Sequence, residues 1–63
     1  MHWTLIMTII FFNQHDYIKD RSVIIQPFQS RQQCERAIHH TKQMLRENPL
    51  TKLHEMDAKC YKN

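Results

Sequence analysis

The chain has 63 residues, of which 41% are hydrophobic, 24% are charged and none is glycine. A chain of this length forms one domain and buries only about 60% of its unfolded surface, so one core leaves it marginally stable without a disulfide, a metal or a partner. Phosphate-binding loops, dinucleotide-binding turns and nucleophile elbows all need glycine, so the absence of glycine argues strongly against an enzyme that binds nucleotides. Nine Lys and Arg against six Asp and Glu give a net charge of +3, spread along the chain as on a solvated surface.

The opening run over residues 3–12 alternates in the manner of a β-strand. Trp3, Leu5 and Met7 begin one apolar face, and Thr4 and Thr8 interrupt the other. The run is shorter than the about 20 apolar residues of a spanning helix and lacks the basic start and small-residue cleavage site of a signal peptide. We therefore expect no membrane span and a cytoplasmic location, with a periplasmic or secreted location as the alternative.

The second face of this strand also carries apolar residues, which need a cover. We expect this face, together with an aromatic residue beside the following turn, to form a protein interface. The partner is another protein or a second copy of the chain, which would give a homodimer. The residues of this predicted interface are Ile6, Ile10, Phe12 and Tyr17.

A second strand is predicted over residues 17–27, after the polar turn at residues 13–16. It returns antiparallel to the first strand as a hairpin. Because proline cannot donate a ladder hydrogen bond, we expect Pro27 to end this strand.

A helix is predicted over residues 31–47. Ser30 and Gln33 have the spacing of a capping box, and Pro49 stops the helix by Asn48. One helical stripe is apolar and faces a core; it consists of Cys34, Ala37, Ile38, Thr41 and Leu45, with Met44 at its margin.

A short third strand is predicted over residues 54–61, where Met56, Ala58 and Cys60 share one side. The order strand, strand, helix, strand predicts a single small α+β domain, β-β-α-β, with one amphipathic helix packed on one face of an antiparallel sheet.

Cys34 and Cys60 should meet between helix and sheet. A disulfide there would close a loop of about 26 residues, for which chain entropy gives about 3 to 3.5 kcal/mol. Two buried thiols in a reducing cytoplasm are the alternative. No zinc-ligand spacing is present, and we expect no metal and no cofactor. Asp16 and Asp20 are typical solvated turn residues, so no catalytic residue and no enzyme activity are expected.

A second class of function, nucleic-acid binding, would use the basic residues of the helix and would lose affinity steeply with salt. These residues are Arg31, Arg36, Lys42 and Arg46.

Several landmarks together resemble a family of short enterobacterial and prophage-encoded proteins catalogued as a domain of unknown function. They are Phe12-Asn13, the segment Asp16-Tyr17-Ile18-Lys19-Asp20, the helix start Ser30-Arg31-Gln32-Gln33-Cys34, and Cys60-Tyr61. The chain departs from that pattern in lacking a turn glycine, in having His15 where a cysteine often stands, and in a longer helix with a break at Pro49.

The resemblance implies a phage or mobile-element origin and no known activity. By analogy with small phage proteins that lack a catalytic constellation, we expect a protein-binding module that occupies the surface of a host protein of unknown identity, such as an inhibitor of a host or defence enzyme.

Overall fold

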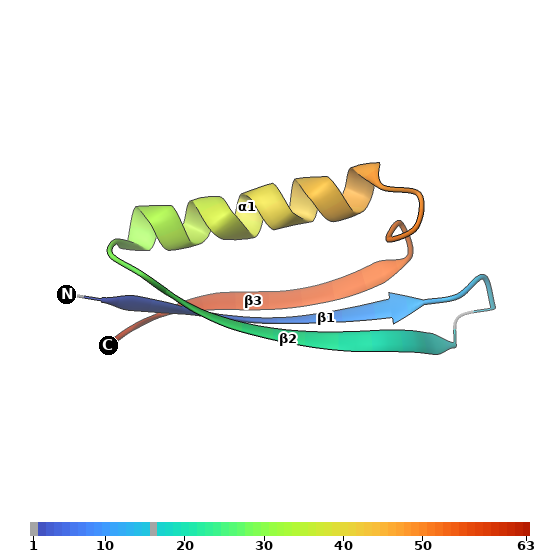
Figure 1. Cartoon of the computed structure of the whole chain (residues 1–63), viewed down its shortest axis with the longest axis horizontal. Helices are drawn as coiled ribbons and strands as arrows, with labels where there is room; N and C mark the ends of the chain where they lie inside the picture. The colour runs from blue at the N-terminus through green and yellow to red at the C-terminus, as the bar shows by residue number, and fades with distance from the viewer. Residues whose placement is uncertain (1, 16) are drawn as a thin grey trace.

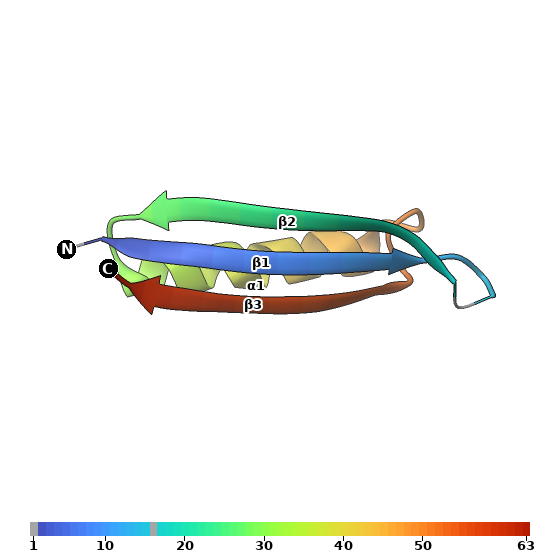
Figure 2. The ribbon, with the colours of Figure 1, turned by 90° about the horizontal axis from the view of Figure 1, so that it is seen from below.

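The sheet is built around its first strand. The computed structural model describes residues 2–15 and 17–63. β1 (Trp3–Phe12) is the central strand, with β2 (Ile18–Phe28) and β3 (His54–Lys62) antiparallel on either side, and α1 (Arg31–Glu47) lies between β2 and β3 in the chain. Figure 1 shows α1 along one side of the sheet, and Figure 2 shows the strand order β2-β1-β3. The predicted α+β class is confirmed.

The core lies between β1 and α1. Leu5, Met7 and Ile9 project from one side of β1 and are 2%, 1% and 4% exposed, and Cys34 of α1 is fully buried with them. The alternation of β1 selects these three residues, because successive side chains of a strand point to opposite faces. A ring of half-buried apolar residues surrounds them: Trp3, Phe11, Phe28, Ala37, Ile38, Leu45, Met56, Ala58 and Cys60. Met44, expected at the margin of the helical stripe, is 57% exposed.

The ends of α1 follow from its flanking residues. Ser30 has extended backbone (φ −139°, ψ 157°), and its side-chain oxygen accepts a hydrogen bond from the Gln33 N–H at 3.2 Å. This bond satisfies one of the free N–H groups of the first turn. At the other end Asn48 is extended, as a residue before proline must be, and its N–H donates to the Met44 carbonyl at 3.2 Å.

Asn13 organises the hairpin connection. Its side-chain oxygen accepts hydrogen bonds from the N–H groups of His15 and Tyr17 at 2.9 and 3.1 Å, and its own N–H donates to the Tyr17 carbonyl at 2.9 Å. An asparagine side chain that bonds the backbone of its own neighbours in this way stabilises a turn. The pairing of Phe11 with Asp20 and of Phe12 with Ile18 leaves Lys19 as the extra residue of a β-bulge.

Pro27 does not end β2, which corrects the sequence prediction. It pairs with Thr4, and the strand continues to Phe28. Asn63 donates to the His2 carbonyl, and Phe12 donates to the Leu53 carbonyl, so the even-numbered residues of β1 bond toward β3 and the odd-numbered ones bond toward β2. The β2 residues that stand opposite even-numbered β1 residues therefore direct their N–H and C=O groups away from β1, toward the outer edge of the sheet. Because the nitrogen of Pro27 is among them, the missing N–H breaks no ladder bond.

Candidate protein-interaction surface

The side of the sheet that faces away from α1 carries the candidate site. Strand pairing places Ile6 beside Ile25 and Thr8 beside Val23 on this side. Ile6, Val23 and Ile25 are 40%, 60% and 68% exposed, and Ile10 on the same side is half-buried. We call the four apolar residues Ile6, Ile10, Val23 and Ile25 the open face. No other described segment covers them, and contiguous exposed apolar surface is a typical mark of a protein contact.

The β3 side of the same surface is charged. Glu55, Asp57 and Lys59 stand opposite Ile10, Thr8 and Ile6 in the ladder, so their side chains share the surface with the open face. Lys59 lies over the ring of Tyr61, with 5.5 Å between its Nζ and the ring centroid. The apolar half of the surface over β1 and β2 is thus bordered along β3 by side chains that prefer water. This border limits the apolar contact to the open face itself.

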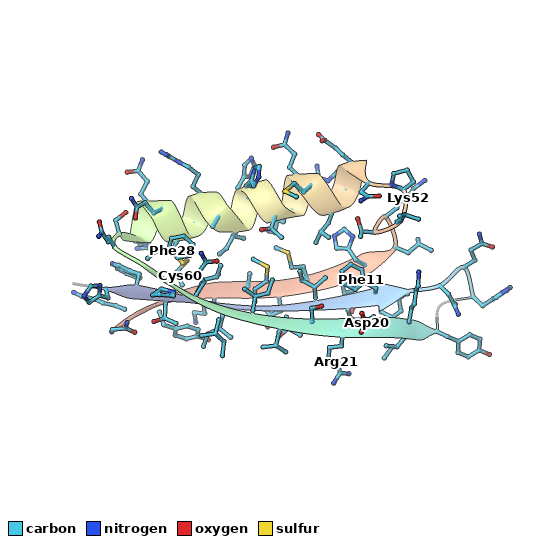
Figure 3. All side chains as sticks on the ribbon, in the orientation of Figure 1. Phe11, Asp20, Arg21, Phe28, Lys52 and Cys60 are labelled. Atoms are coloured by element: carbon cyan, nitrogen blue, oxygen red, sulfur yellow. A yellow bond between two sulfur atoms is a disulfide. The ribbon has the colours of Figure 1, made fainter. Side chains whose placement is uncertain are left out.

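At the hairpin end, the charged Arg21 borders the open face. Arg21 stands opposite Ile10 in the ladder, and Figure 3 shows its side chain pointing away from α1, whereas Phe11, Phe28 and Cys60 lie between sheet and helix.

The structure brings together two of the four residues predicted for the interface. Ile6 and Ile10 belong to the open face. Phe12 is half-buried at the end of β1, where it lines a hollow with Lys52, Leu53 and His54. Tyr17 is 70% exposed in the hairpin connection. The predicted set therefore shares two residues with the open face and extends beyond it toward the hairpin end.

Sequence reasoning missed Val23 and Ile25. Three apolar residues in a row, Val23-Ile24-Ile25, have no alternation, so the pattern does not tell which of them faces the helix. Pairing with β1 decides it: Ile24 stands beside buried Met7, and its neighbours stand on the other side. The sequence nonetheless contains a signal for an exposed apolar face. One helix covers only one face of a sheet, and both β1 and β2 carry apolar residues on both faces.

Arg31, the first of the basic residues predicted for nucleic acid, has partners within the chain. Its Nε donates to Glu35 Oε1 at 2.9 Å, and its guanidinium carbon lies 5.8 Å from the centroid of the Trp3 ring. Both members of the ion pair are well exposed, so the pair contributes little to stability.

The other three basic residues of the predicted set are divided between two places on α1. Arg36 lies beside Phe28 and His40, on the flank toward β2, whereas Lys42 and Arg46 share a shallow hollow that includes an acidic residue, Glu47. The structure thus does not gather the four predicted residues on one face of the helix.

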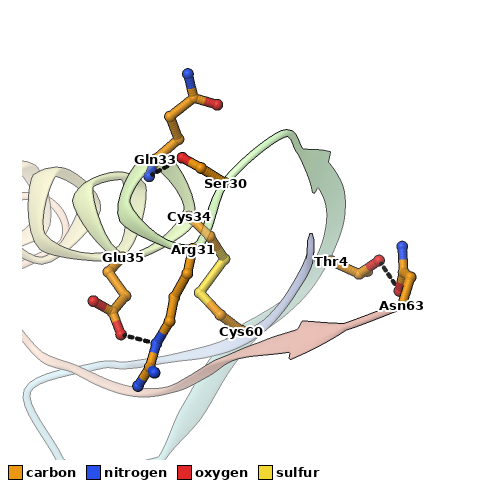
Figure 4. Close-up of a disulfide and its surroundings, with 8 residues drawn as sticks. All are labelled: Thr4, Ser30, Arg31, Gln33, Cys34, Glu35, Cys60 and Asn63. Carbon is orange, nitrogen blue, oxygen red and sulfur yellow. Dashed lines mark hydrogen bonds and ion pairs between the residues drawn. A yellow bond between two sulfur atoms is a disulfide. The ribbon is translucent and has the colours of Figure 1, made fainter. Parts of the chain in front are cut away.

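Cys34 and Cys60 form a disulfide that joins the first turns of α1 to β3, with 6.2 Å between the two Cα atoms. Figure 4 shows it between the Ser30 cap and the Arg31–Glu35 ion pair. Cys34 is fully buried, so the bond lies against the core rather than on the surface. Of the two alternatives that the sequence left open, the structure contains the bonded pair.

Within residues 2–15 and 17–63, no group of three or more His, Cys, Asp or Glu side chains is arranged to hold a metal ion. Asp16, weighed above with Asp20, lies outside the described residues. In the same part of the chain α1 is neither long nor apolar enough to cross a membrane.

Comparison with models of known protein families gives no match. Comparisons with curated proteins and with solved structures give none either.

Proposed function

We propose that the protein is a small phage- or prophage-encoded protein-binding module that inhibits a host or defence protein by covering part of its surface, without catalysis. The observation that supports binding is the open face. Its most exposed member, Ile25, is 68% exposed, whereas only four apolar side chains are buried among residues 2–15 and 17–63. The phage origin and the inhibitory role rest on the family resemblance described above.

The shape of the surface supports a protein rather than a small molecule as the partner. Small ligands bind in concave pockets that enclose most of their surface. The open face is one side of a three-stranded sheet, and its apolar residues form a strip with a charged border. An apolar centre with a polar rim is the usual composition of a protein–protein interface.

The division of the basic residues gives no such support to the nucleic-acid alternative. Arg31 is paired with Glu35, and Arg36 lies apart from Lys42 and Arg46. Binding to nucleic acid is retained as an outcome of the experiment.

The test compares capture of a bacterial host protein by the tagged protein and by two variants that each gain one negative charge. Ile25→Glu changes the open face, and Gln32→Glu changes an exposed residue in the first turn of α1, on the other side of the molecule. We expect the wild type and Gln32→Glu to retain a stoichiometric protein through high salt and nuclease, and Ile25→Glu to retain at least about tenfold less, because a charge at the centre of an apolar contact loses its hydration.

Equal capture by both variants would refute a role for the open face. Loss of all captured material with nuclease would replace the proposal with nucleic-acid binding. An inhibitory role further predicts that the captured protein loses activity with the wild type and not with Ile25→Glu.

A further inference from the structure

The outer edge of β2 has a row of outward backbone hydrogen-bonding groups, of which the Arg21 N–H donates to Asp20 Oδ1 of the same strand at 2.8 Å. β2 is an edge strand, with β1 on one side and no described strand on the other, as Figure 2 shows. Because the odd-numbered residues of β1 bond to β2, the β2 residues between those bonded pairs direct their backbone groups outward. These outward groups are the N–H and C=O of Arg21, Val23 and Ile25 and the C=O of Pro27. We call this row the free edge of β2. Exposed edges of this kind readily pair with another strand.

Two features limit the length of the free edge. Pro27 has no N–H to donate, and the bulge at Lys19 interrupts the regular ladder on the other side. The residues between them that carry both a donor and an acceptor outward are Arg21, Val23 and Ile25. Their middle is Val23.

We propose that a second copy of the chain pairs with this edge, antiparallel and two-fold symmetric about Val23. In this register Val23 faces the partner's Val23, and Arg21 faces the partner's Ile25 in both directions. Each of these pairs exchanges both backbone hydrogen bonds, as wide antiparallel pairs do. Every outward donor and acceptor of Arg21, Val23 and Ile25 then has a partner, with the partner's Ile25 carbonyl replacing the exposed Asp20 carboxylate as the acceptor of the Arg21 N–H.

The neighbouring symmetric registers leave backbone groups unpaired. Centring the pair on Ile24 sets Arg21 opposite the partner's Pro27, which cannot donate to the Arg21 carbonyl. Centring it on Ser22 sets Ile25 opposite the bulged Lys19. The complementarity of the edge with itself, in one register only, favours a second copy over an unrelated strand.

Charge also favours this register. Arg21 is the only charged residue between positions 21 and 25, and the two copies of Arg21 lie at opposite ends of the paired segment. Four residues of strand separate them along the chain direction, about 13 Å at 3.3 Å per residue, which exceeds the screening length of about 8 Å at physiological salt. No like charges stand opposite one another, and Val23 contacts an apolar residue at the axis.

The edge of β3 is less suited to such pairing. Its outward backbone groups are flanked by Glu55, Asp57 and Lys59, and charged side chains along an edge discourage a second strand. The dimer therefore forms through β2 and has six strands in one sheet, with the two helices on the same side. The two open faces then lie next to each other, and they stay available, so this inference does not depend on the proposed function.

The register is tested by two matched variants at one position. Ile25→Glu and Ile25→Lys remove the same apolar side chain, but only in this register does each introduced charge stand opposite the partner's Arg21. Sedimentation equilibrium from micromolar to millimolar concentration should give Ile25→Lys a dimer dissociation constant at least about fivefold above that of Ile25→Glu, because opposite charges across two strands attract and like charges repel. The ratio should fall toward one at high salt.

A measurement on the wild type is independent of the variants. Isotope-filtered NMR of a mixed labelled and unlabelled sample should show the α-proton of Ser22 in contact with that of the partner's Ile24, since these residues form the close pair beside Val23. A monomer at millimolar concentration, equal dissociation constants for the two variants, or a dimer without this contact would each overturn the proposal. Capture of a host protein should fall equally in both variants, because both place a charge on the open face. The capture experiment therefore tests the proposed function, and the dissociation constants test the dimer.

Discussion

Removal of the disulfide should cost this domain most of its stability. Cys34 and Cys60 are 26 residues apart, and chain entropy assigns a crosslink over that separation about 3.5 kcal/mol at 25 °C. Domains of this size gain only about 3 to 5 kcal/mol from a core. In the described part of the chain the core comprises four buried residues, one of which is Cys34 itself.

The perturbation is made in two ways, by reducing the wild type and by substituting Cys34→Ala and Cys60→Ala together. Urea unfolding followed by circular dichroism should give about 3.5 kcal/mol less stability for the reduced wild type, and a melting temperature lower by roughly 15 to 25 °C. The double variant should be somewhat less stable still, because it also loses the buried sulfur atoms. Adding reductant to the double variant is the control and should change nothing.

A loss below about 1 kcal/mol on reduction would refute the entropic reasoning. It would mean that the helix is held to the sheet by packing alone. The same experiment bears on location, because disulfides persist in oxidising compartments and are rare in the cytoplasm. A reduced form that stays folded agrees with the proposed cytoplasmic location, and one that unfolds at 37 °C favours the periplasmic or secreted alternative.

Three further predictions concern individual side chains and are checked by the same urea titrations. Met7→Ala should lower stability by about 2 to 5 kcal/mol, because Met7 is 1% exposed between β1 and α1; a smaller loss would mean that the core closes around the gap. Ser30→Ala should lower stability by about 1 kcal/mol through loss of the bond to the Gln33 N–H, and an unchanged midpoint would contradict the cap. Glu35→Gln should change stability by less than about 0.5 kcal/mol, since both partners of its ion pair are exposed, and a large salt-dependent loss would show a stronger coupling to Arg31.

Much of the fold follows from local patterns in the sequence. The alternation of Leu5, Met7 and Ile9 locates the buried side of β1, since each strand residue reverses the side. Ser30 and Pro49 bracket α1, because one supplies an acceptor to the first turn and the other forbids helical backbone before it. These signals involve residues close in sequence, so their effect does not depend on how the rest of the chain is folded.

The candidate site depends on information that is not local. Val23 and Ile25 join Ile6 only through the register of β2 on β1, and that register depends on the bulge at Lys19. The placement of Pro27 likewise depends on which strand of the sheet is at the edge. A proline that would end a central strand is tolerated at an edge, where its nitrogen faces outward.

The position of β1 in the middle of the sheet also governs how the chain folds. β1 precedes both of its partner strands, and β3 reaches it only after β2, α1 and the following connection. Thr4 donates to the side chain of Asn63 across a separation of 59 residues, almost the whole chain. Contacts of such high sequence separation slow folding, because loop closure must precede any gain from pairing. During synthesis the hairpin of β1 and β2 is therefore made before the helix that covers Met7 and before Cys60 can bond, and it exposes apolar residues on both faces until those segments arrive.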